Sequence, residues 1–165
     1  MPELLKPDFE TVYETFYDRV YKYAYTILLN RENAEDVVSE TFLAAYLAYA
    51  GYDPTRASLA TWLTRIAHNK AVDFVKSAAY RKHEELNGSD EPSISEDIAN
   101  KMETTETVLW IYSHLTRAEC EFLNLRYVME LKDAEVSELY ELPVKTINKR
   151  YQRLIAKCRR LLEDA

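Results

Sequence analysis

Residues 133–150 read DAEVSELYELPVKTINKR, and this stretch decides the fold of the C-terminal part of the chain. Asp133 is the expected N-cap of a short helix (AEVSELY), and Glu141 and Leu142 fall at a tight turn. Pro143 is typical of the start of a second helix. Two helices joined in this way form a helix-turn-helix unit, which the sequence therefore predicts here.

The second helix of this unit is expected to have a basic outer face. Apolar residues at positions 144, 147, 151, 154 and 155 form one stripe that faces inward. The residues left to face outward near the helix start are Lys145, Thr146, Lys149, Arg150 and Arg153. Such side chains reach phosphates and base edges in a DNA major groove. The alternative is that these side chains are only solvated. The position of the basic face on the second helix of a bihelical unit favours DNA binding.

Charge is distributed unevenly along the chain of 165 residues, whose net charge is −7. Residues 1–83 hold 10 Lys and Arg against 11 Asp and Glu, residues 84–142 hold 4 against 15, and residues 143–165 hold 7 against 2. The local field, and not the total charge, governs phosphate binding. The acidic composition is therefore compatible with a nucleic-acid partner at the basic end.

The composition predicts an all-α protein. Only 2 Gly and 5 Pro occur, so an all-β or glycine-loop architecture is improbable, and 47% hydrophobic residues suffice for a buried core. Two Cys without a disulfide or metal-binding motif indicate a reducing compartment. The sequence shows neither a signal peptide nor a long apolar run, so we expect a cytoplasmic location and no membrane insertion.

Helical periodicity predicts three helices in the N-terminal half. The first begins at Phe9, the second begins after Asn33, and Ser58 is the expected N-cap of the third. Trp62 lies on the apolar stripe of the third helix and is expected in the core.

The periodicity is interrupted at residues 84–103, which contain 7 acidic residues, 1 Lys and few large apolar side chains. This composition predicts a flexible acidic linker. Helical spacing resumes at Val108, and Thr116 with Glu119 predicts a capping box. The sequence thus predicts two small helical domains, residues 1–83 and 104–165, on either side of the linker.

Three motifs, in order, resemble the extracytoplasmic-function (ECF) sigma factors of bacterial RNA polymerase. Residues 34–42, AEDVVSETF, resemble the signature A-E-D-x-x-Q-E-x-F. Residues 59–75, LATWLTRIAHNKAVDFV, resemble the run T-W-L-x-x-I-A-x-N-x-A-x-D, and residues 145–153, KTINKRYQR, lie over G-T-V-x-S-R-x-x-R. The resemblance covers nearly the whole chain.

For residues 1–83, the resemblance implies sigma region 2, which binds core polymerase and the melted minus-10 promoter element. Polymerase docking is expected through the acidic residues Glu35, Asp36 and Glu40, although an acidic helix start stabilised by its macrodipole is the alternative. The melted strand is expected to contact Asn69 and the loop that carries Tyr52, because amides pair with base edges and aromatic rings stack on exposed bases.

For residues 104–165, the resemblance implies sigma region 4, which binds the minus-35 duplex and the polymerase flap. The outward-facing residues of the second helix named above are the expected DNA contacts. Ser39 stands where the family usually has Gln, and Lys145 and Lys149 stand where it usually has Gly and Ser. The two lysines add charge to the DNA-facing surface.

Other functions remain open at this point. LTRAECEFLNLRY (residues 115–127) also resembles LuxR-type effector domains, so a stand-alone helix-turn-helix regulator is one alternative, and a helical adaptor without nucleic-acid binding is another. No catalytic or metal-binding spacing is present in the sequence, so we expect no enzyme activity, cofactor, metal or small-molecule substrate. Because the chain begins almost at its first helix, restraint is expected to come from a separate anti-sigma factor.

Overall fold

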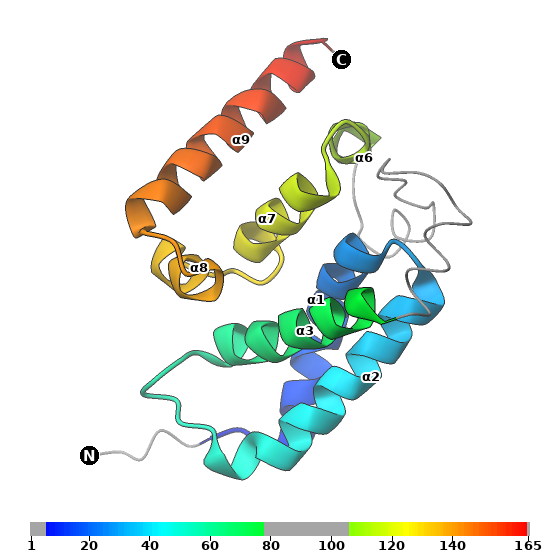
Figure 1. Cartoon of the computed structure of the whole chain (residues 1–165), viewed down its shortest axis with the longest axis vertical. Coiled ribbons are helices and arrows are strands. Elements are labelled where there is room, and N and C mark those ends of the chain that lie inside the picture. Colours follow the sequence, from blue (N-terminus) through cyan, green and yellow to red (C-terminus); the bar gives the residue numbers. More distant parts are fainter. Residues whose placement is uncertain (1–5, 78–105, 165) are drawn as a thin grey trace. The chain divides into compact units, whose positions relative to one another are not determined.

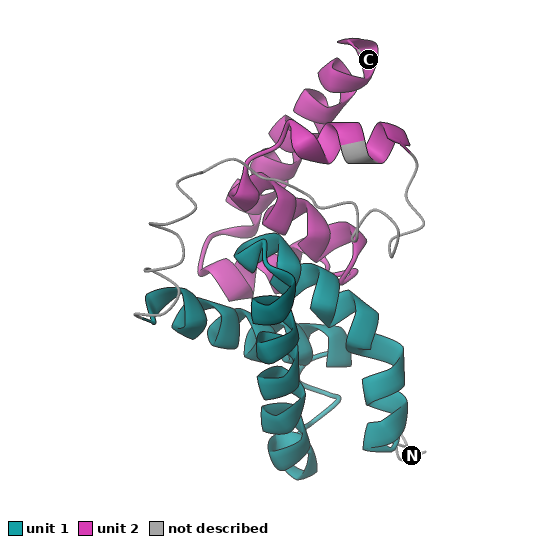
Figure 2. Cartoon of the chain, turned by 90° about the vertical axis from the view of Figure 1, so that its right-hand side faces the viewer, with its two compact units in different colours: residues 1–87 teal, residues 88–165 magenta. Residues whose placement is uncertain are grey.

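The computed structural model describes residues 6–77 and 106–164, and all regular elements in these ranges are helices (Figure 1). This confirms the predicted all-α class. The chain divides into two compact units, residues 1–87 and 88–165 (Figure 2). The predicted linker, residues 84–103, lies outside the described residues. In the described ranges, no helix has both the length and the apolar character needed to cross a membrane.

The described part of unit 1, residues 6–77, contains three mutually packed helices and one short turn of 3₁₀-helix. The elements are α1 (Phe9–Leu28), α2 (Arg31–Ala48), η1 (Tyr49–Gly51) and α3 (Leu59–Lys76). Their fully buried side chains include Val12, Val20, Tyr23, Val37, Val38 and Leu63. Each large apolar side chain removed from water stabilises the fold by about 1.5–3 kcal/mol.

The helix starts of unit 1 follow from short polar side chains that accept backbone N–H bonds. Ser58 accepts from the N–H of Thr61, as predicted. The prediction for α2 was wrong: Asn30, not Asn33, is the N-cap, and it accepts from the N–H of Asn33 at 2.9 Å. The apolar positions used for the prediction begin only at Ala34, so they do not reveal the polar first turn of this helix.

Between residues 106 and 164, unit 2 has four helices, α6 (Glu106–Ser113), α7 (Arg117–Tyr127), α8 (Asp133–Tyr140) and α9 (Val144–Asp164). Thr116 caps α7 by accepting from the N–H of Glu119, as the sequence predicts.

Asp133 is not the N-cap of α8, contrary to the prediction. Lys132 occupies the cap position, and its backbone N–H donates to the Glu135 carboxylate at 3.1 Å. The carboxylate of Asp133 is instead 3.1 Å from the guanidinium of Arg126 on α7. An ion pair with a neighbouring helix therefore takes the place of the capping bond.

The core of unit 2 centres on Tyr151 of α9. Its ring stacks on Phe122 of α7 with centroids 4.0 Å apart, and its hydroxyl donates to the backbone carbonyl of Phe122 at 2.8 Å. The Arg126 guanidinium lies over the same ring, 4.3 Å from its centroid. These contacts join α7 to the middle of α9. Val144, which the sequence stripe places inward, is 42% exposed because it lies at the very start of the helix.

Turns in this glycine-poor chain use residues with side chains in the left-handed region. Leu29, Glu130 and Glu141 have φ angles of 50°, 57° and 55°. A non-glycine residue pays about 1–2 kcal/mol for this conformation. The cost at Glu141 is offset by local bonds: Leu142 donates its N–H to the carbonyl of Ser137 at 3.2 Å, and the Ser137 hydroxyl donates to the carbonyl of Leu142.

Candidate polymerase and promoter interfaces

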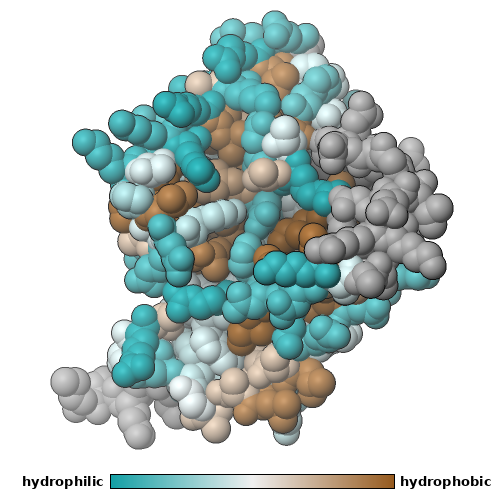
Figure 3. Space-filling model, viewed as in Figure 1, coloured by the Kyte–Doolittle hydropathy of each residue, from teal (hydrophilic) through white to brown (hydrophobic). Residues whose placement is uncertain are grey.

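One exposed stripe runs along α2 and combines two carboxylates with two leucines. Asp36, Glu40, Leu43 and Leu47 are all exposed, the leucines by 61% and 74%. Spacings of three and four residues place all four on the same face of the helix. Figure 3 shows apolar side chains at the surface in the lower part of the view, over the C-terminal half of α2. We call these four residues the α2 stripe.

Glu35 differs from the two carboxylates of the α2 stripe. It is half-buried, and its carboxylate is 3.2 Å from the Nε of Arg31, one turn earlier on the same helix. Its charge is therefore partly compensated within α2. Ser39 is exposed between Asp36 and Glu40.

The sequence did not predict the apolar half of the stripe. Tyr46 follows Val38 and Phe42 at the four-residue spacing of a core position but is 63% exposed, and no sequence motif points to Leu43 or Leu47. Exposed large apolar side chains in a row mark interaction surfaces. The sequence signal for both leucines is their spacing of three and four residues along the face that begins at Asp36.

The structure corrects the expectation that Tyr52 stacks on an unpaired base. Its ring is only 8% exposed and lies between Tyr49, with centroids 6.0 Å apart, and Trp62 of α3, with centroids 4.9 Å apart. Its hydroxyl donates to the carbonyl of Ala57 at 2.8 Å. Burial also raises the pKa of Tyr52 above its ordinary value. Tyr52 is thus a packing residue of the loop, and Trp62 is half-buried beside it.

Asn69 is exposed on α3, where its amide is accessible to a partner. The preceding residue, His68, fixes this part of α3 against α1, because its Nδ1 is hydrogen-bonded to the hydroxyl of the buried Tyr23 at 2.9 Å. The amide is therefore presented from a helix held in place by the core.

The predicted helix-turn-helix is formed by α8, the turn at Glu141 and Leu142, and α9. The predicted DNA contacts Lys145, Lys149, Arg150 and Arg153 are exposed, and Thr146 is half-buried. Ile147, Tyr151 and Leu154 are buried beneath them. The structure therefore brings all five side chains together on the first turns of one helix.

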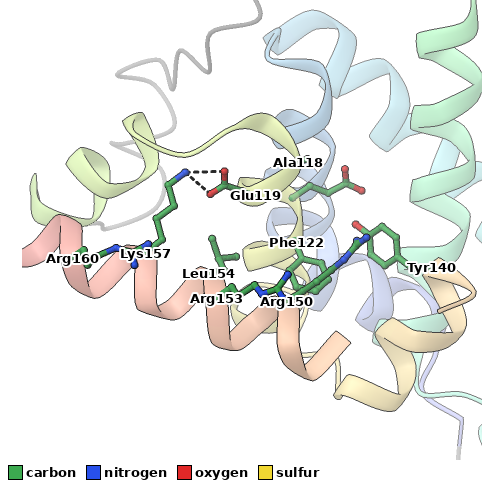
Figure 4. Close-up of a pocket in the computed structure, with 10 residues that line it drawn as sticks. Ala118, Glu119, Phe122, Tyr140, Arg150, Arg153, Leu154, Lys157 and Arg160 are labelled. Carbon is green, nitrogen blue, oxygen red and sulfur yellow. Dashed lines mark hydrogen bonds and ion pairs between the residues drawn. The ribbon is translucent and has the colours of Figure 1, made fainter. Parts of the chain in front are cut away.

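Arg150 and Arg153 also border a groove between α7 and α9 (Figure 4). The groove has a volume of about 570 Å³, and Phe122 and Leu154 form part of its apolar lining. Lys157 lies along it and donates to both carboxylate oxygens of Glu119 at 2.9 Å. Periodicity does not predict this groove, because its two walls come from helices separated in sequence.

Neither cysteine has the environment of a reactive thiol. Burial raises the pKa of Cys120 to about 12, and burial likewise raises the pKa of Cys158. A cysteine nucleophile needs a lowered pKa and a nearby base or positive field. Both thiols therefore stay protonated at neutral pH.

Comparison with known proteins identifies similar sequences among sigma factors. Residues 12–81 match the sigma-70 region 2 family. The chain is 27% identical to the ECF RNA polymerase sigma factor SigW of Bacillus subtilis, over 94% of this chain and 89% of the relative. It is 30% identical to the ECF RNA polymerase sigma factor SigK of Mycolicibacterium vanbaalenii, over 88% of this chain and 81% of the relative.

Solved structures show the same fold. The chain resembles the sigma factor RpoE of Bartonella quintana, determined with the anti-sigma factor NepR, with a TM-score of 0.69, 16% identity and coverage of 94% of this chain and 97% of that chain. It also resembles CnrH, determined with the cytosolic domain of CnrY, with a TM-score of 0.61, 24% identity and coverage of 94% and 88%. With a relative that is 30% identical over 81% of its length and a matching region 2, the chain belongs to the extracytoplasmic-function sigma factors, which direct RNA polymerase to promoters for the initiation of transcription.

Proposed function

We propose that the two units divide the work of promoter recognition, with residues 1–83 as sigma region 2 and residues 104–165 as sigma region 4. The observation that carries this proposal is the exposed basic start of α9 on a helix-turn-helix, in a chain whose net charge is −7. Cations gathered in this way match the minus-35 duplex, whose phosphates dominate affinity and whose major groove admits a helix.

The α2 stripe is the proposed contact with core polymerase. Asp36 and Glu40 provide negative charge for a basic partner surface, with Glu35 at its edge, and Leu43 and Leu47 provide apolar area that becomes buried on docking. In such a surface the charged side chains steer the approach of the partner, and the apolar side chains form the part of the interface that loses its water on binding. This combination distinguishes the stripe from an acidic helix start stabilised only by its macrodipole, because Asp36 lies beyond the first turn.

The separate stretch 84–103 is proposed as the linker between the two binding units. It contains 7 carboxylates and 1 Lys, and charged linkers of this kind repel themselves. Twenty residues at about 3.3 Å each reach roughly 65 Å, close to the length of twenty base pairs at 3.4 Å. This reach allows the two units to contact separate promoter elements.

The protein is proposed to act in the cytoplasm as a specificity subunit without enzyme activity. An anti-sigma factor is its proposed regulatory partner. One solved structure of the same fold, that of Bartonella quintana RpoE, contains the anti-sigma factor NepR, and another contains CnrH with the cytosolic domain of CnrY. Within the described residues, the groove between α7 and α9 and the α2 stripe are exposed surfaces available to such a partner.

Reconstituted transcription tests the proposal. The full chain is added to core polymerase with a library of promoter fragments, and specific run-off transcripts are sequenced. Transcripts that depend on both the chain and the promoter support the proposal. Sequence-specific duplex binding without polymerase binding would instead indicate a stand-alone regulator, and no salt-dependent DNA binding would indicate an adaptor.

Lys149→Ala and Arg150→Ala should weaken minus-35 binding by different routes. Arginine reads guanine with two parallel hydrogen bonds, so Arg150→Ala should cost about 1–3 kcal/mol and relax specificity at one position. Lysine acts as a point charge on phosphate, so Lys149→Ala should weaken all sequences uniformly and lower the salt slope by about one unit. Binding titrations over a salt series measure both effects.

The matched control for these variants is Arg159→Ala, which removes one exposed cation farther along the same helix. It should leave promoter specificity unchanged. If Lys149→Ala and Arg150→Ala behave like Arg159→Ala, the start of α9 is only solvated and is not the minus-35 reader.

Asn69→Ala should impair promoter opening more than duplex binding. The expected partner of the exposed Asn69 amide is an unstacked base, which is available only after melting. Permanganate reactivity of minus-10 thymines in the holoenzyme complex measures opening, and a minus-35 duplex titration provides the internal control. Normal permanganate reactivity in the variant would contradict the role of Asn69.

A further inference from the structure

The segment before α1 is tied to the turn that follows α2. Lys6 donates from its Nζ to the backbone carbonyl of Tyr49, and the same Nζ lies 4.5 Å from the centroid of the Tyr49 ring. In return, the Tyr49 hydroxyl donates to the backbone carbonyl of Pro7. Two reciprocal hydrogen bonds and a cation–π contact therefore connect residues 42 or 43 positions apart in sequence.

This connection continues through aromatic rings to α3. Tyr49 is parallel to Tyr52, with an interplanar angle of 7°, and Tyr52 packs against Trp62 near the start of α3. Lys6 also lies 5.7 Å from the centroid of the Tyr52 ring. A single ammonium group thus faces both tyrosines of the stack that precedes α3.

The loop between this stack and α3 is exposed and is held by short-range contacts, one of which is the bond from the Tyr52 hydroxyl to the carbonyl of Ala57. Residues 53–56 are exposed, and nothing lies within 4 Å of a Cβ atom built on Gly51. Asp53 closes a local turn by accepting from the backbone N–H and hydroxyl of Thr55 at 2.9 and 2.7 Å. These bonds lower the pKa of Asp53, and the charges of Arg56 and Lys6 act in the same direction.

Lys6 is not needed to start α1. Asp8 already caps that helix by accepting from the backbone N–H and the hydroxyl of Thr11 at 2.8 and 2.6 Å. All recorded contacts of Lys6 instead go to the turn and loop between α2 and α3. A lysine placed in this way orders a loop at the expense of its own side-chain entropy, which is useful where the loop needs one fixed conformation.

We infer that Lys6 is a positioning residue for promoter opening. It holds the Tyr49–Tyr52–Trp62 stack in place, and the stack in turn holds the loop 53–57 and the start of α3. Together these elements keep the conformation that receives the melted strand. The inference rests on the proposed role of Asn69 in reading the minus-10 element and on the role that the family resemblance implies for this loop. Lys6 acts on the loop and not on DNA. Without Lys6, the loop must become ordered during promoter opening, so opening becomes less favourable. Binding to core polymerase and to the minus-35 duplex stays the same.

The tether itself is tested in the free full-length chain. Trp62 and Trp110 are the two tryptophans, so a Trp110→Phe background leaves Trp62 as the fluorescent reporter of the stack. Lys6→Ala should increase acrylamide quenching of Trp62 at least twofold. Lys6→Arg, which keeps the charge and the cation–π contact, should restore most of the protection, and Lys22→Ala, which removes a half-buried lysine from the middle of α1, should have no effect.

The functional test uses the reconstituted holoenzyme and permanganate footprinting. Lys6→Ala should lower the fraction of open complex at least fivefold, with core affinity and minus-35 affinity unchanged within twofold, and Lys6→Arg should recover most of the opening. Tyr49→Phe removes the bond to Pro7 and should also impair opening. Its effect should not add to that of Lys6→Ala, because both substitutions break the same tether.

Two results would overturn the inference. The first is normal opening in Lys6→Ala. The second is a defect that adds fully to that of Tyr49→Phe and lowers the salt slope by about one unit, which indicates a direct phosphate contact. The proposed function is tested separately by Asn69→Ala: if that variant is defective in opening and Lys6→Ala is not, the inference about Lys6 alone fails.

Discussion

Asp36→Arg together with Glu40→Arg should abolish binding to core polymerase while leaving the fold intact. Both carboxylates are exposed on α2, so their replacement removes no core contact. Against a basic partner surface, like charges cost several kcal/mol. We expect the affinity to fall at least about 100-fold, which corresponds to about 2.7 kcal/mol. Equilibrium binding to purified core polymerase, without DNA, measures this loss.

The matched control is Glu14→Arg with Asp18→Arg on α1. These two residues are also exposed, carry the same charge and are four positions apart, so the control changes the net charge by the same amount. It should keep its affinity for core polymerase within about threefold. Equal affinity of the two double variants would show that the α2 stripe is not the docking surface.

Tyr151→Ala should have the largest effect on stability. The substitution removes a side chain that is 1% exposed, its stack on Phe122 and its hydrogen bond to the Phe122 carbonyl. Truncating a large buried aromatic side chain costs about 3–5 kcal/mol, a large part of the 5–15 kcal/mol by which a domain is stable. Hydrogen exchange should show loss of amide protection in α7 and α9, with unit 1 unchanged, and minus-35 binding should be lost with it.

Two further variants separate the contributions of Tyr151. Tyr151→Phe keeps the ring and removes only the hydroxyl, so it should cost about 0.5–1.5 kcal/mol, because the Phe122 carbonyl loses this hydrogen bond but keeps its place in the α7 hydrogen-bond ladder. Tyr127→Ala truncates a tyrosine of α7 that is 57% exposed, and its stability should change by no more than about 0.5 kcal/mol. If Tyr151→Ala is as stable as Tyr127→Ala, the stack is not the centre of the core.

The sequence by itself determined the helices and most of their starts. Apolar residues three and four apart predict α1, α3 and α9 because burial of one helical face is a local, periodic property. The caps at Ser58 and Thr116 were also predictable, because a side chain that accepts from an N–H three residues later needs no distant partner. The order of three short motifs predicted the family.

Tertiary structure alone decided which side chains of the candidate interfaces are available to a partner. Tyr46 has the spacing of a core residue and is 63% exposed, whereas Tyr52 lies in a loop and is 8% exposed. Exposure depends on what the neighbouring elements cover, and Tyr52 is covered by Tyr49 and by Trp62 of α3. Periodicity within one helix carries no information about these neighbours.

The same reason explains the contacts made between separate elements of the fold. Lys6 bonds to Tyr49, Arg126 pairs with Asp133 instead of leaving it to cap α8, and Lys157 reaches Glu119 across the groove. Each contact involves a charged side chain that local sequence predicts only as a surface charge or a cap. Only the packing of separate segments brings these atoms within hydrogen-bond distance. Local sequence therefore determined the helices and the family, whereas tertiary structure determined which side chains form the surfaces through which the protein acts.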